Sequence, residues 1–269
     1  MQTTISNEIL KMKFKYFIND CMASNSIGVN KEWEPHITKF TQLYNSLYNI
    51  KNIIDIGANF GYHTLLFSRE CSENVYAFEP QIQNFDILKD NVEMNKVKNV
   101  ILHNYACGDQ NCEIKMPLFY CSHTINMGDI TPNVNINDNF SISKSITLDE
   151  YNFSHKIDFI KLDVQGWEKK VLIGATNLLK THKPLLIVEF EYFQLEKTNT
   201  TCKELFDFIR EQNYYIFYLE YDYPSDHVCV HNDNLTDFRL KFKNYILPHI
   251  ENNNINNNLI NGVYEKIVM

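Results

Sequence analysis

Short apolar runs alternate with stretches of helical periodicity from residue 51 onward. The run at residues 157–162 is of the continuous apolar kind that is typical of strands covered on both faces. The stretch after it, residues 167–182, carries an apolar stripe at helical spacing. This alternation predicts one doubly wound α/β domain with a mostly parallel sheet. The predicted strands are residues 51–57, 74–78, 100–103, 157–162, 185–190 and 214–219.

One further strand breaks this alternation near the end of the pattern. Residues 228–231 follow the strand at 214–219 after Tyr223 and Pro224, which leaves too few residues for a crossover helix. We therefore expect one antiparallel strand at an edge of the sheet.

The same pattern divides the chain into three parts. Residues 1–50 have mixed polarity and place apolar side chains at helical spacing near their end, so we expect a helical N-terminal cap. Residues 51–232 form the sheet domain. Residues 233–269 form a C-terminal extension whose Asn-rich part, residues 251–260, is expected to be a flexible linker. Residues 122–145 are polar, irregular and longer than most connections, which makes them a candidate lid.

Composition and charge narrow the class of protein. The 269 residues are 44% hydrophobic and 22% charged, as in soluble globular proteins. The formal charge is −8 and no long basic block is present, which argues against a protein that binds nucleic acid through phosphate contacts. There is no signal peptide and no window of about 20 apolar residues, so we expect a cytoplasmic protein without a membrane segment.

The seven cysteines are odd in number and scattered, which indicates a reducing compartment rather than a disulfide framework. The one arrangement that resembles a metal site is Cys107, Cys112, Cys121 and His123. It contains no C-x-x-C pair of the kind that zinc sites usually supply, so no metal is expected.

Residues at the carboxyl ends of the first two strands indicate a nucleoside ligand. In a doubly wound sheet, ligands bind at this edge. The turn from Asp55 to Gly61 has the spacing G-x-x-x-G, which disfavours the G-x-G-x-x-G of dinucleotide sites. Glu79 ends the second strand 22 residues beyond Gly57, where an acidic side chain can accept the hydroxyls of a ribose. The two glycines are expected to leave room for the backbone to approach this ligand.

A set of segments in the sheet domain resembles the FkbM family of S-adenosylmethionine-dependent methyltransferases. The resemblance covers about residues 50–231, and the segments occur in the order of the family. They are residues 55–68 (DIGANFGYHTLLFS), 78–95 (FEPQIQNFDILKDNVEMN), 104–109 (NYACGD), 146–151 (ITLDEY), 157–175 (IDFIKLDVQGWEKKVLIGA) and 184–191 (PLLIVEFE).

The resemblance implies a class I methyltransferase fold, which is Rossmann-like, and S-adenosylmethionine as the cofactor. It also assigns residues to the parts of that cofactor. Asp55, Gly57, Asn59 and Gly61 would surround its amino acid end, Glu79 would bind its ribose beside Pro80, and Ala106 and Asp109 would lie along its adenine.

The family motif D-V-E-G-x-E falls on residues 163–168, which here read DVQGWE. Asp163 would face the reacting methyl group, and Gln165 stands where the family usually has Glu. The expected reaction is methyl transfer to a hydroxyl of a sugar, glycan or other small molecule. An aliphatic hydroxyl is a weak acid, so a base must take its proton as the bond forms. The candidates at the ligand edge are Asp163, Glu189 and His63.

Three alternatives are open to tests. A nicotinamide-dependent oxidoreductase is disfavoured by the glycine spacing. A cofactor-binding module without catalysis would not need Asp163. A metal-dependent catechol-type transferase would need clustered Asp and Asn ligands, whereas the acids here are scattered. The oligomeric state is not predicted.

Overall fold

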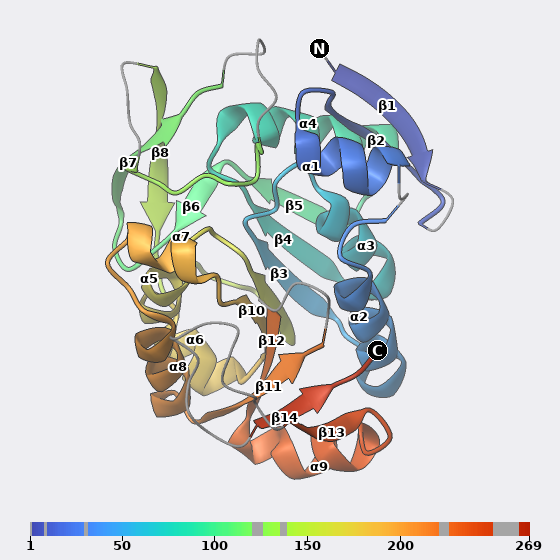
Figure 1. Cartoon of the computed structure of the whole chain (residues 1–269), viewed down its shortest axis with the longest axis vertical. Coiled ribbons are helices and arrows are strands. Elements are labelled where there is room, and N and C mark those ends of the chain that lie inside the picture. Colours follow the sequence, from blue (N-terminus) through green and yellow to red (C-terminus); the bar gives the residue numbers. More distant parts are fainter. Residues whose placement is uncertain are drawn as a thin grey trace.

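A long sheet with helices on both faces forms the centre of the molecule (Figure 1). The computed structural model describes residues 2–7, 10–29, 32–119, 126–134, 139–220, 226–249 and 264–269. Within these residues, nine strands pair in the order β13-β14-β11-β12-β10-β9-β3-β4-β5. Their bounds are β3 (Asn52–Ile56), β4 (Asn74–Phe78), β5 (Val100–His103), β9 (Phe159–Leu162), β10 (Leu185–Glu189), β11 (Tyr214–Leu219), β12 (Asp226–His231), β13 (Ile246–His249) and β14 (Tyr264–Ile267).

The strand order confirms the prediction of a doubly wound, mostly parallel sheet. β3 lies between β4 and β9 and is parallel to both, so the chain winds outward from β3 in both directions. The strand predicted at residues 228–231 is β12, and it runs antiparallel to both β10 and β11. β12 lies between β10 and β11 and not at an edge of the sheet. The edge is formed by β13, which pairs antiparallel with β14.

Alternation within the strands supplies two separate apolar cores. Ile53 packs into the core on one face and Ile54 into the core on the other, because successive side chains of a strand point to opposite faces. Helices of the first face are α2 (Pro35–Tyr48), α3 (Tyr62–Glu70), α4 (Ile82–Met94) and α9 (Leu235–Lys241). Helices of the second face are α5 (Glu168–Ile173), α6 (Thr176–His182) and α8 (Cys202–Glu211), and the short α7 (Tyr192–Lys197) follows β10.

The N-terminal segment begins with a β-hairpin, so the prediction of a helical cap over residues 1–50 is wrong for its first part. β1 (Gln2–Asn7) pairs antiparallel with β2 (Met12–Phe17). In β2, buried Phe14 and Tyr16 alternate with more exposed lysines, which is the period of a strand. Helical structure follows in α1 (Cys21–Ala23), a π-helical turn (Ser24–Val29) and α2.

Two asparagines of α4 hold the hairpin against the sheet domain. The Asn91 side chain accepts a hydrogen bond from the Lys15 backbone N–H at 2.6 Å and donates to the Lys15 carbonyl at 2.9 Å. Asn95 makes the same pair of bonds to Lys13, at 2.8 and 2.7 Å. The hairpin edge is therefore satisfied by α4 instead of by another strand.

A small second sheet replaces part of the segment expected to be an irregular lid. It contains β6 (Tyr105–Cys107), β7 (Cys112–Pro117) and β8 (Phe140–Ile146) in the order β6-β8-β7. Residues 120–125 and 135–138, with Cys121 and His123, lie outside the described residues, as does the predicted linker at 251–260. The role of residues 122–145 as a lid stays a prediction, and so do the domain boundaries.

The turn after β3 needs Gly57 for a reason that differs from the prediction. Gly57 has a φ of 81°, and a Cβ placed on it would lie 1.8 Å from the Asp163 carbonyl oxygen. A Cβ on Gly61 would lie 2.5 Å from Leu88 Cδ1. Both glycines therefore make room for neighbouring parts of the protein, and at Gly57 this allows the turns after β3 and β9 to meet.

Gly57→Ala tests this close approach. The left-handed backbone alone costs an L-residue about 1–2 kcal/mol, and the overlap with a backbone carbonyl adds to it, so we expect a loss of more than about 2 kcal/mol in the free energy of unfolding. Gly128→Ala is the control, because its Cβ would meet only side-chain atoms, at 3.1 and 3.3 Å. Urea denaturation of both variants measures the difference, and equal losses would contradict the account.

Candidate active site

A cavity of about 670 Å³ opens at the carboxyl ends of β3, β4, β9 and β10. Its size is within the range of small-molecule sites. Gly57 and Glu79 line one part of it, Asp163 and Glu189 another, and Glu34 from the N-terminal segment a third. The cavity thus brings together members of the two groups of residues that the sequence assigned to the cofactor and to catalysis.

The predicted cofactor side of the cavity is organised by Glu79. One carboxylate oxygen accepts a hydrogen bond from the Asn59 backbone N–H at 2.8 Å, and the other accepts one from the Gln81 backbone N–H at 2.9 Å. Burial raises the pKa of Glu79 to about 7, although these two bonds oppose the shift. Each oxygen keeps a further lone pair for a ligand. Pro80 and Ala106 line the cavity beside it.

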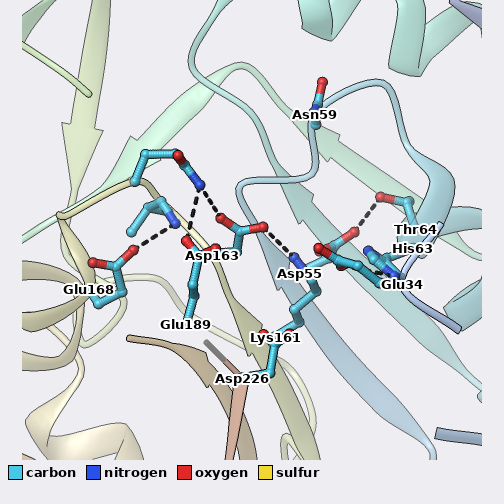
Figure 2. Close-up of polar contacts among 12 residues, drawn as sticks. Glu34, Asp55, Asn59, His63, Thr64, Lys161, Asp163, Glu168, Glu189 and Asp226 are labelled. Carbon is cyan, nitrogen blue, oxygen red and sulfur yellow. Dashed lines mark hydrogen bonds and ion pairs between the residues drawn. The ribbon is translucent and has the colours of Figure 1, made fainter. Parts of the chain in front are cut away.

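Asn59 supplies a second polar group to this part of the cavity. It adopts a φ of 51° and lies above the turn after β3 (Figure 2). Its Oδ1 atom is buried and has no hydrogen-bond partner among the described residues. A buried acceptor without a partner costs free energy unless a ligand satisfies it, so Asn59 and Glu79 together fit a polar, hydroxyl-bearing ligand.

Three predicted cofactor residues do not line the cavity. Asp55 is fully buried behind the turn, where its Oδ2 accepts a hydrogen bond from Thr64 Oγ1 at 2.5 Å. Gly61 precedes α3 and packs against Leu88. Asp109 is exposed and follows Gly108, which packs against Ser145 and Trp167. None of the three is among the residues that line the cavity, and their contact with a cofactor stays a prediction.

Strand register explains why the charged groups converge. Lys161 of β9 pairs with Asp55 of β3, so their side chains share one face of the sheet. Glu189 of β10 pairs with Asp226 of β12 near the same edge. Lys161 is 3% exposed and lies among these acids (Figure 2). Burial opposes its charge, but the surrounding carboxylates outweigh burial and raise the pKa of Lys161.

Asp163 is held as a carboxylate at the end of β9. Its Oδ2 pairs with Lys161 Nζ at 3.0 Å, and its Oδ1 accepts a hydrogen bond from Gln165 Nε2 at 2.8 Å. Burial favours the neutral acid, but the charge of Lys161 and these hydrogen bonds outweigh burial and lower the pKa of Asp163. Glu189 differs, because burial and the neighbouring charge of Asp163 raise its pKa well above the usual range.

Gln165 joins these two acids. Its Nε2 also donates to Glu189 Oε2 at 3.0 Å, so one amide group bridges both side chains. A Glu at this position, as is usual in the family, would have no proton to donate when ionised and would add a third negative charge. Gln165 in place of the usual Glu therefore allows one side chain to donate hydrogen bonds to both acids.

Glu168 fixes the turn that carries Gln165. Its Oε1 accepts hydrogen bonds from the backbone N–H groups of Val164 and Gly166, at 3.0 and 3.1 Å. The side chain is buried, and burial raises its pKa to about 7. Gln165 and Gly166 both adopt positive φ within this turn, at 53° and 98°. The last Glu of the motif therefore acts on the backbone and not on a ligand.

The third predicted catalytic residue, His63, is buried and does not line the cavity. Burial and the charge of Lys161 lower its pKa well below the usual value, so its ring is neutral. It reaches the cavity only through Glu34, whose Oε2 lies 3.5 Å from His63 Nε2. The sequence analysis missed Glu34 and Asp226, since neither belongs to a motif and both enter the site through tertiary packing.

Residues of α7 and of the segment 126–132 line another wall of the cavity. Phe193 is 66% exposed and lies at this wall. Lys197 pairs with Asp129 at 2.8 Å, and Gln194 donates to the same carboxylate at 2.7 Å. An exposed aromatic ring beside a polar network suits an acceptor with both polar and apolar faces.

The comparisons with known proteins agree with this geometry. The model of the "Methyltransferase FkbM domain" family matches residues 55–216, which is more than half of the chain. The chain belongs to this methyltransferase family. Membership of this family implies S-adenosylmethionine as the cofactor. This membership argues against the nicotinamide-dependent oxidoreductase.

A curated relative and two solved structures extend the comparison. Hexuronic acid methyltransferase AglP from Haloferax volcanii is 32% identical over 130 residues, which are 47% of this chain and about half (51%) of that protein. A methyltransferase FkbM from Methylobacillus flagellatus is 16% identical, with a TM-score of 0.46 over 69% of this chain and 47% of that chain. A putative methyltransferase from Streptococcus mutans, solved with SAH, is 14% identical, with a TM-score of 0.47 over 72% and 96%.

The described residues offer neither a cluster of metal ligands nor a membrane-spanning helix. In that part of the chain, no group of three or more His, Cys, Asp or Glu side chains is placed to hold a metal ion. Of the four residues considered for zinc, only Cys107 and Cys112 are described. No helix within the described ranges is long and apolar enough to span a membrane.

Gln165→Glu tests the bridge between the acids. The variant loses donors to Asp163 and Glu189 and adds a like charge, and hydrogen bonds to charged groups contribute about 1.5–3 kcal/mol each. We expect the free energy of unfolding to fall by about 3 kcal/mol at pH 8. The loss should be smaller at pH 5, because the new carboxyl has a raised pKa in the folded protein and is protonated there.

Gln42→Glu is the matched control for this variant. Gln42 also donates to a carboxylate, that of Glu70 at 3.5 Å, but the contact is exposed. We expect a change within about 0.5 kcal/mol at both pH values. Chemical denaturation at pH 5 and pH 8 measures both variants, and a Gln165→Glu loss that does not depend on pH would refute the bridge.

Proposed function

We propose that this protein transfers a methyl group from S-adenosylmethionine to a hydroxyl of a sugar, glycan or other small molecule. The observation that carries the proposal is one cavity that holds Glu79 on one side and the ionised Asp163 on the other. The relation to a hexuronic acid methyltransferase supports a sugar acceptor.

The residues of the cavity suggest how the cofactor is held. Glu79 accepts hydrogen bonds from the ribose hydroxyls, and Pro80 and Ala106 flank the adenine side. Asn59 offers its unpaired Oδ1 to the amino acid end. When bound, S-adenosylmethionine supplies an electrophilic methyl group on a positively charged sulfur.

Asp163 and Glu189 define the reacting end of the cavity. The carboxylate of Asp163 is fixed by Lys161 and Gln165, so it can accept a hydrogen bond from the acceptor hydroxyl without reorganising. Glu189, whose pKa is raised by burial, can donate one when it is protonated. Together they orient the hydroxyl for attack in line with the bond that breaks.

Acceptor binding is assigned to the wall formed by α7. Phe193 presents an exposed ring, and sugars expose apolar C–H faces that pack on aromatic rings. Gln194 and Lys197 lie beside it with polar groups for hydroxyls. The protein mixed with S-adenosylmethionine and a panel of methyl glycosides should therefore yield a product heavier by one methyl group. A complete lack of transfer to hydroxyl acceptors would overturn the proposal.

Two variants should separate cofactor binding from turnover. Glu79→Ala should weaken binding of S-adenosylhomocysteine by about 1.5–3 kcal/mol, because it removes the ribose contact, while turnover at saturating cofactor falls less. Asp163→Asn keeps the shape and removes the charge, so turnover should fall by about 10²-fold or more with a smaller change in cofactor affinity.

Calorimetry and a methyl-transfer assay on the same preparations measure both quantities. The reverse ordering, with Asp163→Asn mainly weakening the cofactor, would place Asp163 in the cofactor site. Unchanged affinity in a folded Glu79→Ala variant would remove Glu79 from it.

A further inference from the structure

Glu34 has a strained backbone at the wall of the cavity. It occupies the N-cap of α2 with φ 43° and ψ 66°, in the left-handed region, and its side chain does not cap the helix. This conformation costs a residue other than glycine about 1–3 kcal/mol and persists where the surrounding structure enforces it, often at functional sites. The side chain lines the cavity instead of satisfying its own helix.

The Glu34 carboxyl lies in a buried, charged environment. Its Oε2 atom is buried and has no hydrogen-bond partner among the described residues, while 27% of the side chain is exposed. His63 Nε2, at 3.5 Å, belongs to a neutral ring and therefore cannot cancel a charge on Glu34. The titratable and charged groups around it are His36 of α2, Tyr62 and His63 of α3, Lys161 and Asp163 of β9 and its end, and Asp226 of β12.

These neighbours give Glu34 a pKa that suits a general base working near neutral pH. Burial raises its pKa to about 8, the charge of Lys161 opposes the shift, and the charges of Asp226 and Asp163 add to it. A general base is most effective when its pKa lies near the working pH.

The two acids at the reacting end of the cavity are poorly suited to accept the proton. Asp163 has a lowered pKa because Lys161 and Gln165 stabilise its charge, so it binds a proton weakly. Glu189 holds a proton more tightly than an ordinary carboxyl, because burial and Asp163 raise its pKa. Glu34 lines the cavity and has a pKa of about 8, so it is ionised part of the time near neutral pH and can fill this role.

We propose that Glu34 is the general base that accepts the proton of the acceptor hydroxyl during methyl transfer. This inference rests on the proposed function. The hydroxyl oxygen forms the new bond to the methyl carbon, and the bond from that carbon to sulfur breaks with its electron pair left on sulfur. The hydroxyl proton passes to a carboxylate oxygen of Glu34, which releases it to solvent after the product leaves.

A measurement that needs neither cofactor nor acceptor tests proton binding at Glu34. A carboxyl whose pKa is raised in the folded protein stabilises the fold below its unfolded pKa, and this stability is lost as pH rises through the folded pKa. The free energy of unfolding of the wild type relative to Glu34→Gln should therefore fall between about pH 5 and pH 8 and level off above pH 9.

Glu32→Gln is the matched control, since Glu32 lies two residues away on the same segment and does not line the cavity. Its difference from the wild type should not vary with pH. Urea denaturation at a series of pH values measures all three proteins. Parallel curves for the wild type and Glu34→Gln would overturn the proposal.

The pH dependence of turnover tests the catalytic step. With a methyl glycoside acceptor and saturating cofactor, kcat of the wild type should rise with pH to a plateau above about pH 8. Glu34→Gln should lower kcat by about 10²–10⁴-fold and abolish this rise, while binding of S-adenosylhomocysteine stays within threefold. Glu32→Gln should keep both the rate and the profile.

Each other outcome is also decisive. A Glu34→Gln variant with normal kcat and the same profile contradicts the proposal. If that variant does not fold, Glu34→Asp replaces it, and it should lower kcat while keeping a pH-dependent rise; a flat profile would refute the base. If no hydroxyl acceptor is methylated at any pH by the wild type, the proposed function fails, and the unfolding series still decides whether Glu34 holds a proton.

Discussion

The site depends on one interaction, that of the buried Lys161 ammonium group with the acids around it. The lysine lies in a central strand, beside Asp55 in register and 3.0 Å from Asp163, with Glu34 also near enough to feel its charge. Burying a charge without partners costs several kcal/mol, and burying acids without a cation costs as much. The cation and the acids therefore stabilise one another, and Glu34 and Asp163 of this group line the cavity.

Lys161 also makes the acids of the cavity unequal. The pKa of Asp163, in direct contact with Lys161, is lowered, whereas the pKa of Glu189, which lies beside Asp163 and also contacts Gln165, is raised. Acids whose environments push their pKa values apart can take different parts in one reaction. Such a set of acids can bind a cationic cofactor and a neutral hydroxyl side by side. The proton of the hydroxyl can then pass to an acid of intermediate affinity for protons.

Much of this architecture was predictable from the sequence, because periodicity and turn residues act locally. The strands around β3 and the antiparallel β12 followed from apolar runs and the short turn at Pro224, and the positions of Glu79 and Asp163 followed from strand ends. The hairpin was missed because its stabilising contacts come from Asn91 and Asn95 on a distant helix. Glu34 was missed for the same reason, since its role depends on tertiary packing and on a strained backbone.

The most direct test of the central claim is the pH dependence of stability in Lys161→Met. The account predicts a loss of about 3–5 kcal/mol in the free energy of unfolding at pH 8, where removal of the cation leaves Asp163 and its neighbours as buried, uncompensated charges. The loss should become much smaller at pH 5, because these carboxyls then bind protons as their pKa values rise. A loss of the same size at both pH values would show that Lys161 acts through packing and would contradict the account.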